Sequence, residues 1–202
     1  MIEGRNIKKS YDGKCLFENL NFVIEDQDFI CFSGESGAGK TTLLNIIGLL
    51  EPIDSGEILF DGKKYTTRKE LREYYRTTVG FLFQNFALIE SKTVKENLEI
   101  VSKESRTEYT IKSALEKVGL DNKLNSKIYT LSGGEQQRVA LARLFLKKCK
   151  IILADEPTGS LDKRNALIVM DILKQLNEEG KIVIFVTHDE ELRKRAKRVV
   201  EL

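Results

Sequence analysis

A nine-residue segment, GESGAGKTT at residues 34–42, has the residue types and the spacing to bind a chain of phosphates. It matches the pattern G-x-x-x-x-G-K-[ST], in which backbone N–H groups approach phosphate oxygens without interference from side chains. Lys40 would pair with the β- and γ-phosphates, and the Thr41 hydroxyl would ligate Mg²⁺. A structural loop without nucleotide is the alternative. We expect a nucleotide site that includes Gly34, Glu35, Ser36, Gly37, Ala38, Gly39, Lys40, Thr41 and Thr42.

Two adjacent carboxylates, Asp155 and Glu156, follow an apolar run at residues 151–154. The end of a buried strand is the expected place for a carboxylate that coordinates Mg²⁺, which assigns the metal to Asp155. Adjacent residues on an extended chain point in different directions, so Glu156 would polarise the attacking water. An ordinary strand end that enters an acidic turn is the alternative, and the phosphate loop favours the catalytic interpretation.

A second candidate phosphate-binding segment, LSGGEQQR, occupies residues 131–138. Ser132 and Glu135 fit the S-x-x-E capping box, which predicts the start of a helix. Capping does not require Gly133 and Gly134, and exposed glycines cost backbone entropy. The two glycines make sense if a phosphate must approach this helix end closely. One phosphate loop and one further phosphate-binding segment suggest that each copy of the chain covers the nucleotide of a partner copy.

The elements that must position these groups are short apolar runs that each end at a polar residue. Runs that are apolar on both faces favour strands of a parallel sheet covered by helices, and ligands in such sheets lie beyond the carboxyl ends of the strands. The polar residues should therefore meet in one site. The predicted strands are residues 29–32, 79–83, 151–154 and 182–186, and the predicted helices are residues 40–50, 107–118, 135–147 and 166 to about 180.

The remaining segments differ in character. Residues 85–130 lack a convincing central strand and predict an α-helical insertion into a nucleotide-binding core. Residues 1–27 predict a β-rich edge, with turn signals at residues 11–13 and 25–26. We therefore expect a single α/β domain over residues 1–202, with its core at about 1–84 and 131–202 and the helical part at about 85–130.

Composition excludes several classes of protein. The 33 Lys and Arg residues against 31 Asp and Glu residues give a net charge of +2, which is too balanced to predict nucleic-acid binding. Three widely spaced cysteines, Cys15, Cys31 and Cys149, do not predict a disulfide framework, and Cys31 is expected to be buried. No apolar run has the length of a membrane span, and no signal peptide is recognised. We expect a cytoplasmic protein without direct membrane insertion, whose membrane role would depend on a partner.

Taken in order, GESGAGKTT, Gln84, LSGGEQQR, IILADEP, SLD and the single His188 resemble the ATP-binding cassette (ABC) transporter family over nearly the whole chain. The resemblance implies the ATP-hydrolysing, nucleotide-binding subunit of a membrane transporter, with ATP and Mg²⁺ as cofactors. It also implies an α/β fold: a P-loop NTPase core of the RecA type with a mainly parallel sheet, an N-terminal antiparallel β subdomain and an inserted α-helical subdomain.

The same resemblance implies roles for residues outside the phosphate loop. Gln84 would contact Mg²⁺ and the attacking water, and His188 would contact the γ-phosphate and order Glu156. Tyr11 would stack on adenine, although packing of this tyrosine on an edge strand is an open alternative. At the dimer seam, Asp162 would lie beside the head-to-tail partner, and Ser132, Gly133 and Gly134 would face the γ-phosphate that the partner holds.

Partners are also implied. A second copy or a related cassette would complete the ATP sandwich, and a permease in a separate chain would hold the protein at the inner face of the cell membrane. The segment NFALIESKTVKEN is similar to the branch that serves macrolide export, lipoprotein release and antimicrobial-peptide or bacteriocin export. Phe86, Leu88 and Ile89 would dock a permease helix or form the core of the helical part, and both alternatives are open.

A non-transport cassette ATPase, for example in iron–sulfur assembly, is the alternative function, and a P-loop kinase leaves LSGGEQQR without a purpose. Residues 26–28, DQD, depart from the glycine-acidic turn that the family has before its first core strand. The basic residues 193–198 are expected to form a solvated helix face.

Overall fold

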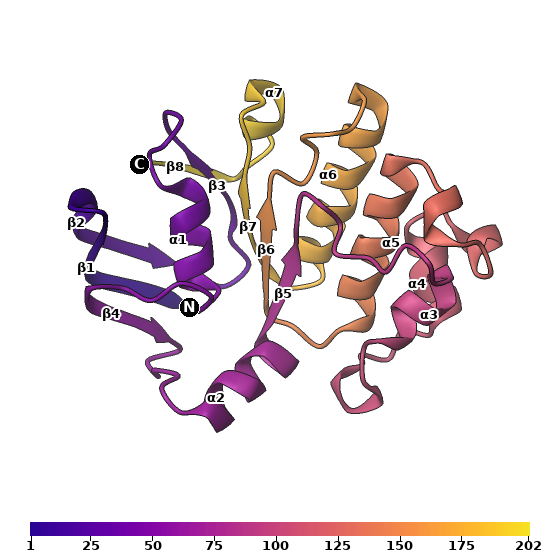
Figure 1. The fold of residues 1–202 in the computed structure, drawn as a ribbon, viewed down its shortest axis with the longest axis horizontal. Helices are drawn as coiled ribbons and strands as arrows, with labels where there is room; N and C mark the ends of the chain where they lie inside the picture. The colour runs from indigo at the N-terminus through magenta and orange to yellow at the C-terminus, as the bar shows by residue number, and fades with distance from the viewer.

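The computed structural model describes residues 1–202 and contains two sheets with helices packed on them (Figure 1). The larger sheet has five parallel strands in the order β5-β6-β7-β3-β8. Its side chains alternate between two apolar clusters, one on each face, as the runs without polar residues predicted. The strands are β3 (Phe29–Ser33), β5 (Val79–Leu82), β6 (Ile151–Asp155), β7 (Ile182–Val186) and β8 (Arg198–Glu201).

The smaller sheet is antiparallel and has the order β2-β1-β4. A tight turn joins its first two strands, and Asp12 and Gly13 both have positive φ there, at 48° and 80°. Helix α1 (Lys40–Ile47) lies between the two sheets in Figure 1 and packs its apolar face, including Leu43 and Ile47, into their shared core. The strands are β1 (Ile2–Tyr11), β2 (Lys14–Ile24) and β4 (Ser55–Phe60).

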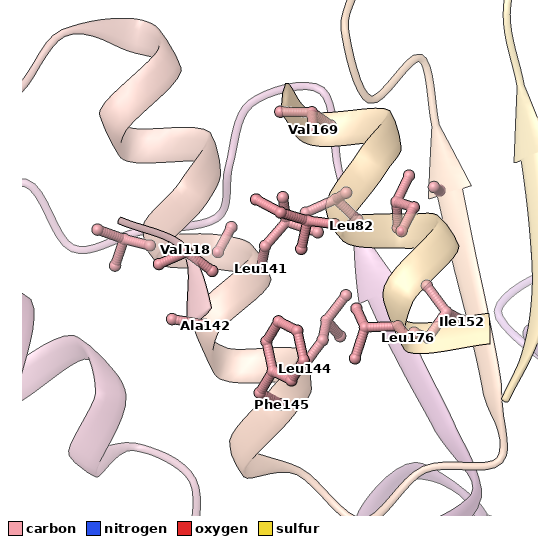
Figure 2. Packing of buried hydrophobic residues seen from close by; sticks show 14 of the residues in the cluster. Leu82, Val118, Leu141, Ala142, Leu144, Phe145, Ile152, Val169 and Leu176 are labelled. Carbon is pink, nitrogen blue, oxygen red and sulfur yellow. The ribbon is translucent and has the colours of Figure 1, made fainter. Parts of the chain in front are cut away.

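The other face of the parallel sheet is covered by the longest helices, α5 (Gly133–Leu146) and α6 (Lys163–Glu178). Figure 2 shows Leu141 and Leu144 of α5 among the same buried side chains as Leu82 and Leu176, in one cluster. Residues 85–130 contain α3 (Val94–Glu99), α4 (Ile111–Lys117) and short helical turns, and no named strand. Their treatment as a separate subdomain stays a prediction.

Several helix ends differ from the predictions. Helix α4 begins at Ile111 and not at residue 107, because Thr110 and Ser113 form a capping box immediately before it. Helix α1 ends at Ile47, since Gly48 caps it and Leu49 then takes a positive φ of 56°. Several elements were not predicted: β4, β8, α7 (Glu190–Arg193), and the stretch formed by α2 (Arg68–Glu73) and a π-helical turn (Tyr74–Thr78).

The prediction of a helix at residues 193–198 was wrong, although most of these residues are exposed to solvent as expected. Helix α7 spans Glu190–Arg193, and the chain then turns into β8, which pairs with β3. The arginines bind other parts of the chain: Arg193 donates to Ser33 Oγ at 3.1 Å, and Arg195 and Arg198 each contact an aspartate at 2.6 Å. The basic charge of this segment is therefore used for internal contacts.

The structure bears on the expectations about disulfides and about membrane-spanning segments. All three cysteines are free, and Cys31 and Cys149 are buried. No helix combines the length and the apolar character that crossing a bilayer requires.

Candidate nucleotide site

The carboxyl ends of four parallel strands and the phosphate loop surround one cavity of about 440 Å³. The structure brings together eleven of the sequence-predicted residues there, while Gly34, Glu35 and Ala38 belong to the loop without lining the cavity. Ser132, Gly133, Gly134 and Asp162 lie outside it. The eleven are Tyr11, Ser36, Gly37, Gly39, Lys40, Thr41, Thr42, Gln84, Asp155, Glu156 and His188.

The phosphate loop is closed around the ammonium group of Lys40. This side chain is 5% exposed, and its Nζ donates to the carbonyl oxygens of Gly34 at 2.9 Å and Glu35 at 2.8 Å. Gly37 has a φ of 84°, and a Cβ placed on it would meet no atom within 4 Å, so its backbone is open to a ligand. The N-terminus of α1 begins at Lys40 and adds its positive dipole end. The arrangement suits an anion with several oxygens.

The candidate metal ligands are hard oxygen donors. Thr41 Oγ1 donates to Asp155 Oδ1 at 3.0 Å, which joins the start of α1 to the end of β6. Gln84 lines the same cavity. A hydroxyl, a carboxylate and an amide oxygen fit Mg²⁺, which is usually bound by one or two carboxylates together with waters and substrate phosphates. No group of three or more His, Cys, Asp or Glu residues could hold a metal ion by itself.

Glu156 combines a strained backbone, a buried carboxylate oxygen and a raised pKa, as a general base can. Its backbone is in the left-handed region at φ 44°, an unusual conformation for a residue with a side chain. Its Oε1 is buried and accepts no hydrogen bond. His188 Nε2 lies 3.2 Å from this oxygen, but the two groups do not form a hydrogen bond. Burial raises the pKa of Glu156, and the charge of His188 opposes this rise.

Tyr11 is 44% exposed at the end of β1 and lines the nucleotide cavity. The ammonium group of Lys9 lies 4.6 Å from the centroid of its ring. Lys9 is itself fixed by an ion pair with Glu51 at 2.5 Å and by the carbonyl oxygen of Pro52 at 2.8 Å. Strand β1 pairs with β4 only as far as Lys8, and at Tyr11 it pairs with β2 alone. Stacking on adenine and packing on a strand edge both stay open for Tyr11.

The second glycine-containing segment starts α5 with the predicted capping box. Ser132 Oγ accepts from the Glu135 N–H at 3.3 Å, and Glu135 Oε2 accepts from the Ser132 N–H at 2.9 Å. Gly133 is exposed, and a Cβ there would have no neighbour closer than 3.9 Å. At Gly134 a Cβ would lie 2.5 Å from the Asn165 side chain. The inference that both glycines clear space for a phosphate therefore needs correction, because Gly134 is required by packing against α6.

Two further residues of this segment were missed as functional candidates. Gln137 is buried and donates to the carbonyl oxygen of Pro157 at 2.6 Å, and Arg138 donates to Asn165 Oδ1 at 2.8 Å. Asn165 also donates to Asp162 Oδ2 at 2.6 Å. These contacts tie α5 to the segment that follows Glu156. Helical spacing could have indicated the first of them, since Gln137 shares a helix face with the buried Leu141.

Comparisons with known proteins agree with this geometry. Residues 17–159 match the family described as "ABC transporter". The whole chain is 43% identical to an uncharacterized ABC transporter ATP-binding protein of Methanocaldococcus jannaschii, of which it covers 95%. It is 39% identical to the macrolide export ATP-binding/permease protein MacB of Campylobacter jejuni, and it spans 33% of the length of that protein.

A solved structure shows the same architecture. The dimeric structure of MJ0796, described as a bacterial ABC transporter cassette, is 37% identical, with a TM-score of 0.86 over 100% of this chain and 94% of that one. The same cassette has been solved as a dimer in a post-hydrolysis state with ADP and Pi, at 35% identity and a TM-score of 0.84 over 100% of this chain and 94% of that chain. The predicted α/β P-loop fold is confirmed, and the chain is an ATP-binding ATPase. It belongs to the ABC transporter family as a nucleotide-binding subunit.

Proposed function

We propose that two copies of this chain, or one copy and a related cassette, close head to tail on two Mg-ATP molecules. The main support is the separation of two half-sites. Lys40 and Glu156 line the nucleotide cavity, whereas Gly133, which has free space around it, lies outside the cavity. In a head-to-tail pair, the signature segment of one copy would face the γ-phosphate held by the other. Such a pair is stabilised by ATP because ATP contacts both copies only in the closed state.

The chemistry follows from the residues around the cavity. Lys40 would exchange its two carbonyl acceptors for β- and γ-phosphate oxygens, and Glu156 would accept a proton from the water that attacks the γ-phosphorus. His188 would contact the γ-phosphate and limit the movement of Glu156. Thr41, Asp155 and Gln84 would hold Mg²⁺, which would neutralise negative charge on the phosphates.

We also propose that the ATPase powers a permease in a separate chain and sits at the inner face of the cell membrane through that partner. A groove of about 390 Å³ next to the Gln84 segment offers a docking surface. The stacked rings of Phe81 and Phe83, 5.3 Å apart, line it, while Ile89 close by in the sequence is 43% exposed. Leu88 packs against the core instead, which leaves Ile89 as the exposed candidate for docking, and both alternatives stay open for Phe86.

The direction and the cargo are proposed from relatives. MacB exports macrolides and PvdT exports pyoverdine by name, and both carry the ATP-binding part and the permease in one protein. We propose export of a peptide, lipoprotein or drug-like substrate, with a bacteriocin as one candidate peptide. A non-transport cassette ATPase is the second candidate, and stable co-purification with a membrane protein in detergent would separate the two.

The pairing is tested with Glu156→Gln in the presence of Mg-ATP. Loss of the proton acceptor should lower kcat by about 10²–10⁴-fold, and ATP should then hold a dimer that elutes ahead of the monomer in size exclusion. The same variant with Mg-ADP is the control and should elute as a monomer. A Glu156→Gln monomer that still hydrolyses ATP would rule out both the assignment of Glu156 and the ATP-driven pairing.

A further inference from the structure

Arg143, on the third turn of α5, reaches across to the segment that follows Gln84. Its Nη1 donates to the carbonyl oxygen of Ala87 at 2.6 Å, and its Nη2 donates to the carbonyl oxygen of Phe86 at 2.8 Å. No carboxylate lies within ion-pair distance of this guanidinium group. Its surroundings are apolar enough for burial to lower the pKa of Arg143. Placing a guanidinium there is costly, and the two carbonyl oxygens are its only hydrogen-bond partners.

The two carbonyl groups belong to an unusual turn. Phe86 and Ala87 are consecutive, and both are in the left-handed region, at φ 60° and 47°. Residues with side chains rarely adopt this conformation and keep it only where the surroundings enforce it. Within the turn, the Phe86 N–H donates to Phe83 O at 3.1 Å and the Ala87 N–H donates to Asn85 O at 2.7 Å. The forked contact from Arg143 joins this turn to α5 by two hydrogen bonds.

The turn connects two parts of the site. Gln84 stands two residues before Phe86 and lines the nucleotide cavity. The ring of Phe86 comes within 3.9 Å of the position that a Cβ on Gly133 would take, at the start of α5. The Gln84 segment is thus close to α5 at its first residue and is hydrogen-bonded to it ten residues later, at Arg143. Both contacts involve the helix that carries the signature segment.

We propose that Arg143 is a positioning residue for ATP hydrolysis, which holds the Phe86–Ala87 turn and thereby fixes Gln84 relative to the signature end of α5. Gln84 and Gly133 then move as one unit when two copies close. The inference rests on the role proposed for Gln84 and adds a residue that touches neither nucleotide nor metal.

The first test compares Arg143→Ala with Arg72→Ala as a control. Arg72 is exposed on α2, and its side chain makes no hydrogen bond or ion pair. Misplacement of a group by about 1 Å can cost on the order of 10²-fold, so kcat of Arg143→Ala should fall by roughly 10- to 100-fold. KM for ATP should change by less than about twofold, because the phosphate loop is untouched. Arg72→Ala should match the unmodified protein. An unchanged kcat, or a loss that appears in KM alone, overturns the proposal.

The second test separates holding the turn from general stability. Glycine adopts positive φ without strain, so in an Ala87→Gly background the turn depends less on Arg143. Arg143→Ala should therefore cost at least about threefold less in kcat in that background than in the unmodified chain. Equal losses in the two backgrounds overturn the proposal. If Arg143→Ala does not fold, Arg143→Lys serves instead, since lysine keeps the charge but not the rigid two-pronged fork.

The third test distinguishes this inference from the proposed function. Hydrogen exchange at the Phe86 and Ala87 amides should become faster in Arg143→Ala and stay unchanged in Gln84→Ala, while both variants lose kcat. Loss of kcat in Arg143→Ala without loss in Gln84→Ala overturns the link through Gln84. Head-to-tail pairing would still stand in that case, because it is measured separately with Glu156→Gln. Unchanged exchange in Arg143→Ala overturns the inference as well.

Discussion

The two glycine-containing phosphate segments of this chain are built in opposite ways. The loop at residues 34–42 is complete within one copy: it wraps Lys40, and its open Gly37 faces a cavity formed by the same chain. The signature segment is supported from behind by Gly134 and Gln137 and leaves its outer residue, Gly133, without a neighbour. The first segment forms its cavity with residues of its own chain, whereas the second would be completed by the proposed partner copy.

The largest change is expected in ATPase activity when two inactive variants, one from each phosphate segment, are mixed. Lys40→Ala removes the cation of the loop, and Gly133→Asp puts a negative charge where the partner's γ-phosphate would lie, so each alone should be inactive. In an equal mixture, half of the dimers are mixed and hold one intact site, which should restore about a quarter of the unmodified ATPase rate. No recovery in the mixture, measured by phosphate release, contradicts head-to-tail pairing. Lys40→Ala mixed with itself at twice the concentration is the control.

The next effect contrasts the two glycines of the signature. Gly134→Ala introduces a Cβ against Asn165 and should destabilise the fold by about 1–3 kcal/mol, as overpacking does. Gly133→Ala has free space, so it should keep the melting temperature and weaken the ATP-dependent dimer instead. Thermal melting without nucleotide and size exclusion with Mg-ATP in the Glu156→Gln background measure the two effects. Equal melting temperatures for both variants would show that Gly134 is not constrained by packing.

A moderate effect concerns pH. Glu156 must be ionised to accept a proton, and its pKa is raised above the ordinary 4.5 by burial. Activity is therefore present above the raised pKa and is lost as the pH falls through it, so the acid limb of kcat should lie above pH 4.5. His188 opposes the rise, and His188→Ala should move the limb further up. A limb at or below the ordinary value would contradict the role of burial at this carboxylate.

The smallest effect is expected for stability when the capping residues of α5 and α4 are replaced. Ser132→Ala and Thr110→Ala each remove the side chain of a capping box, at α5 and at α4, and each should cost about 1 kcal/mol and about 2–4 °C in melting temperature. Only Ser132→Ala should also reduce ATP hydrolysis, because Thr110 lies away from the site. If both variants lost activity in proportion to stability, the signature serine would be acting as a cap alone.

The sequence predicted the strands that carry the chemistry better than the elements at the edges. Residues 182–186 were predicted with the bounds that β7 has, since an uninterrupted apolar run leaves little choice for a strand buried on both faces. Strands β4 and β8 were missed because each has a short apolar part beside exposed residues. Their position depends on pairing with β1 and β3, which a local pattern does not contain.

The motif residues of the site were predictable from the sequence, whereas the residues that pack against them and position them were not. Lys40, Asp155 and Glu156 come together in one cavity because strand ends meet at one edge of a parallel sheet. Arg143 carries no motif of its own, and its contact with Phe86 joins residues 57 positions apart in the chain. Gly134 was misjudged for a similar reason, because its neighbour Asn165 becomes visible only when α5 and α6 are packed.

The contacts of Lys40 within the phosphate loop have a consequence for selectivity. The ammonium group of Lys40 donates to two neutral carbonyl oxygens, which satisfy its hydrogen bonds but leave its positive charge uncompensated. A phosphate oxygen would replace these acceptors and also neutralise the charge, and such charge-assisted hydrogen bonds are stronger than neutral ones. An ion with one phosphate group can replace few of those contacts at once, whereas a di- or triphosphate replaces them and continues along the open backbone at Gly37. We therefore expect the loop to bind di- and triphosphates in preference to a single phosphate group, independently of any contact with adenine.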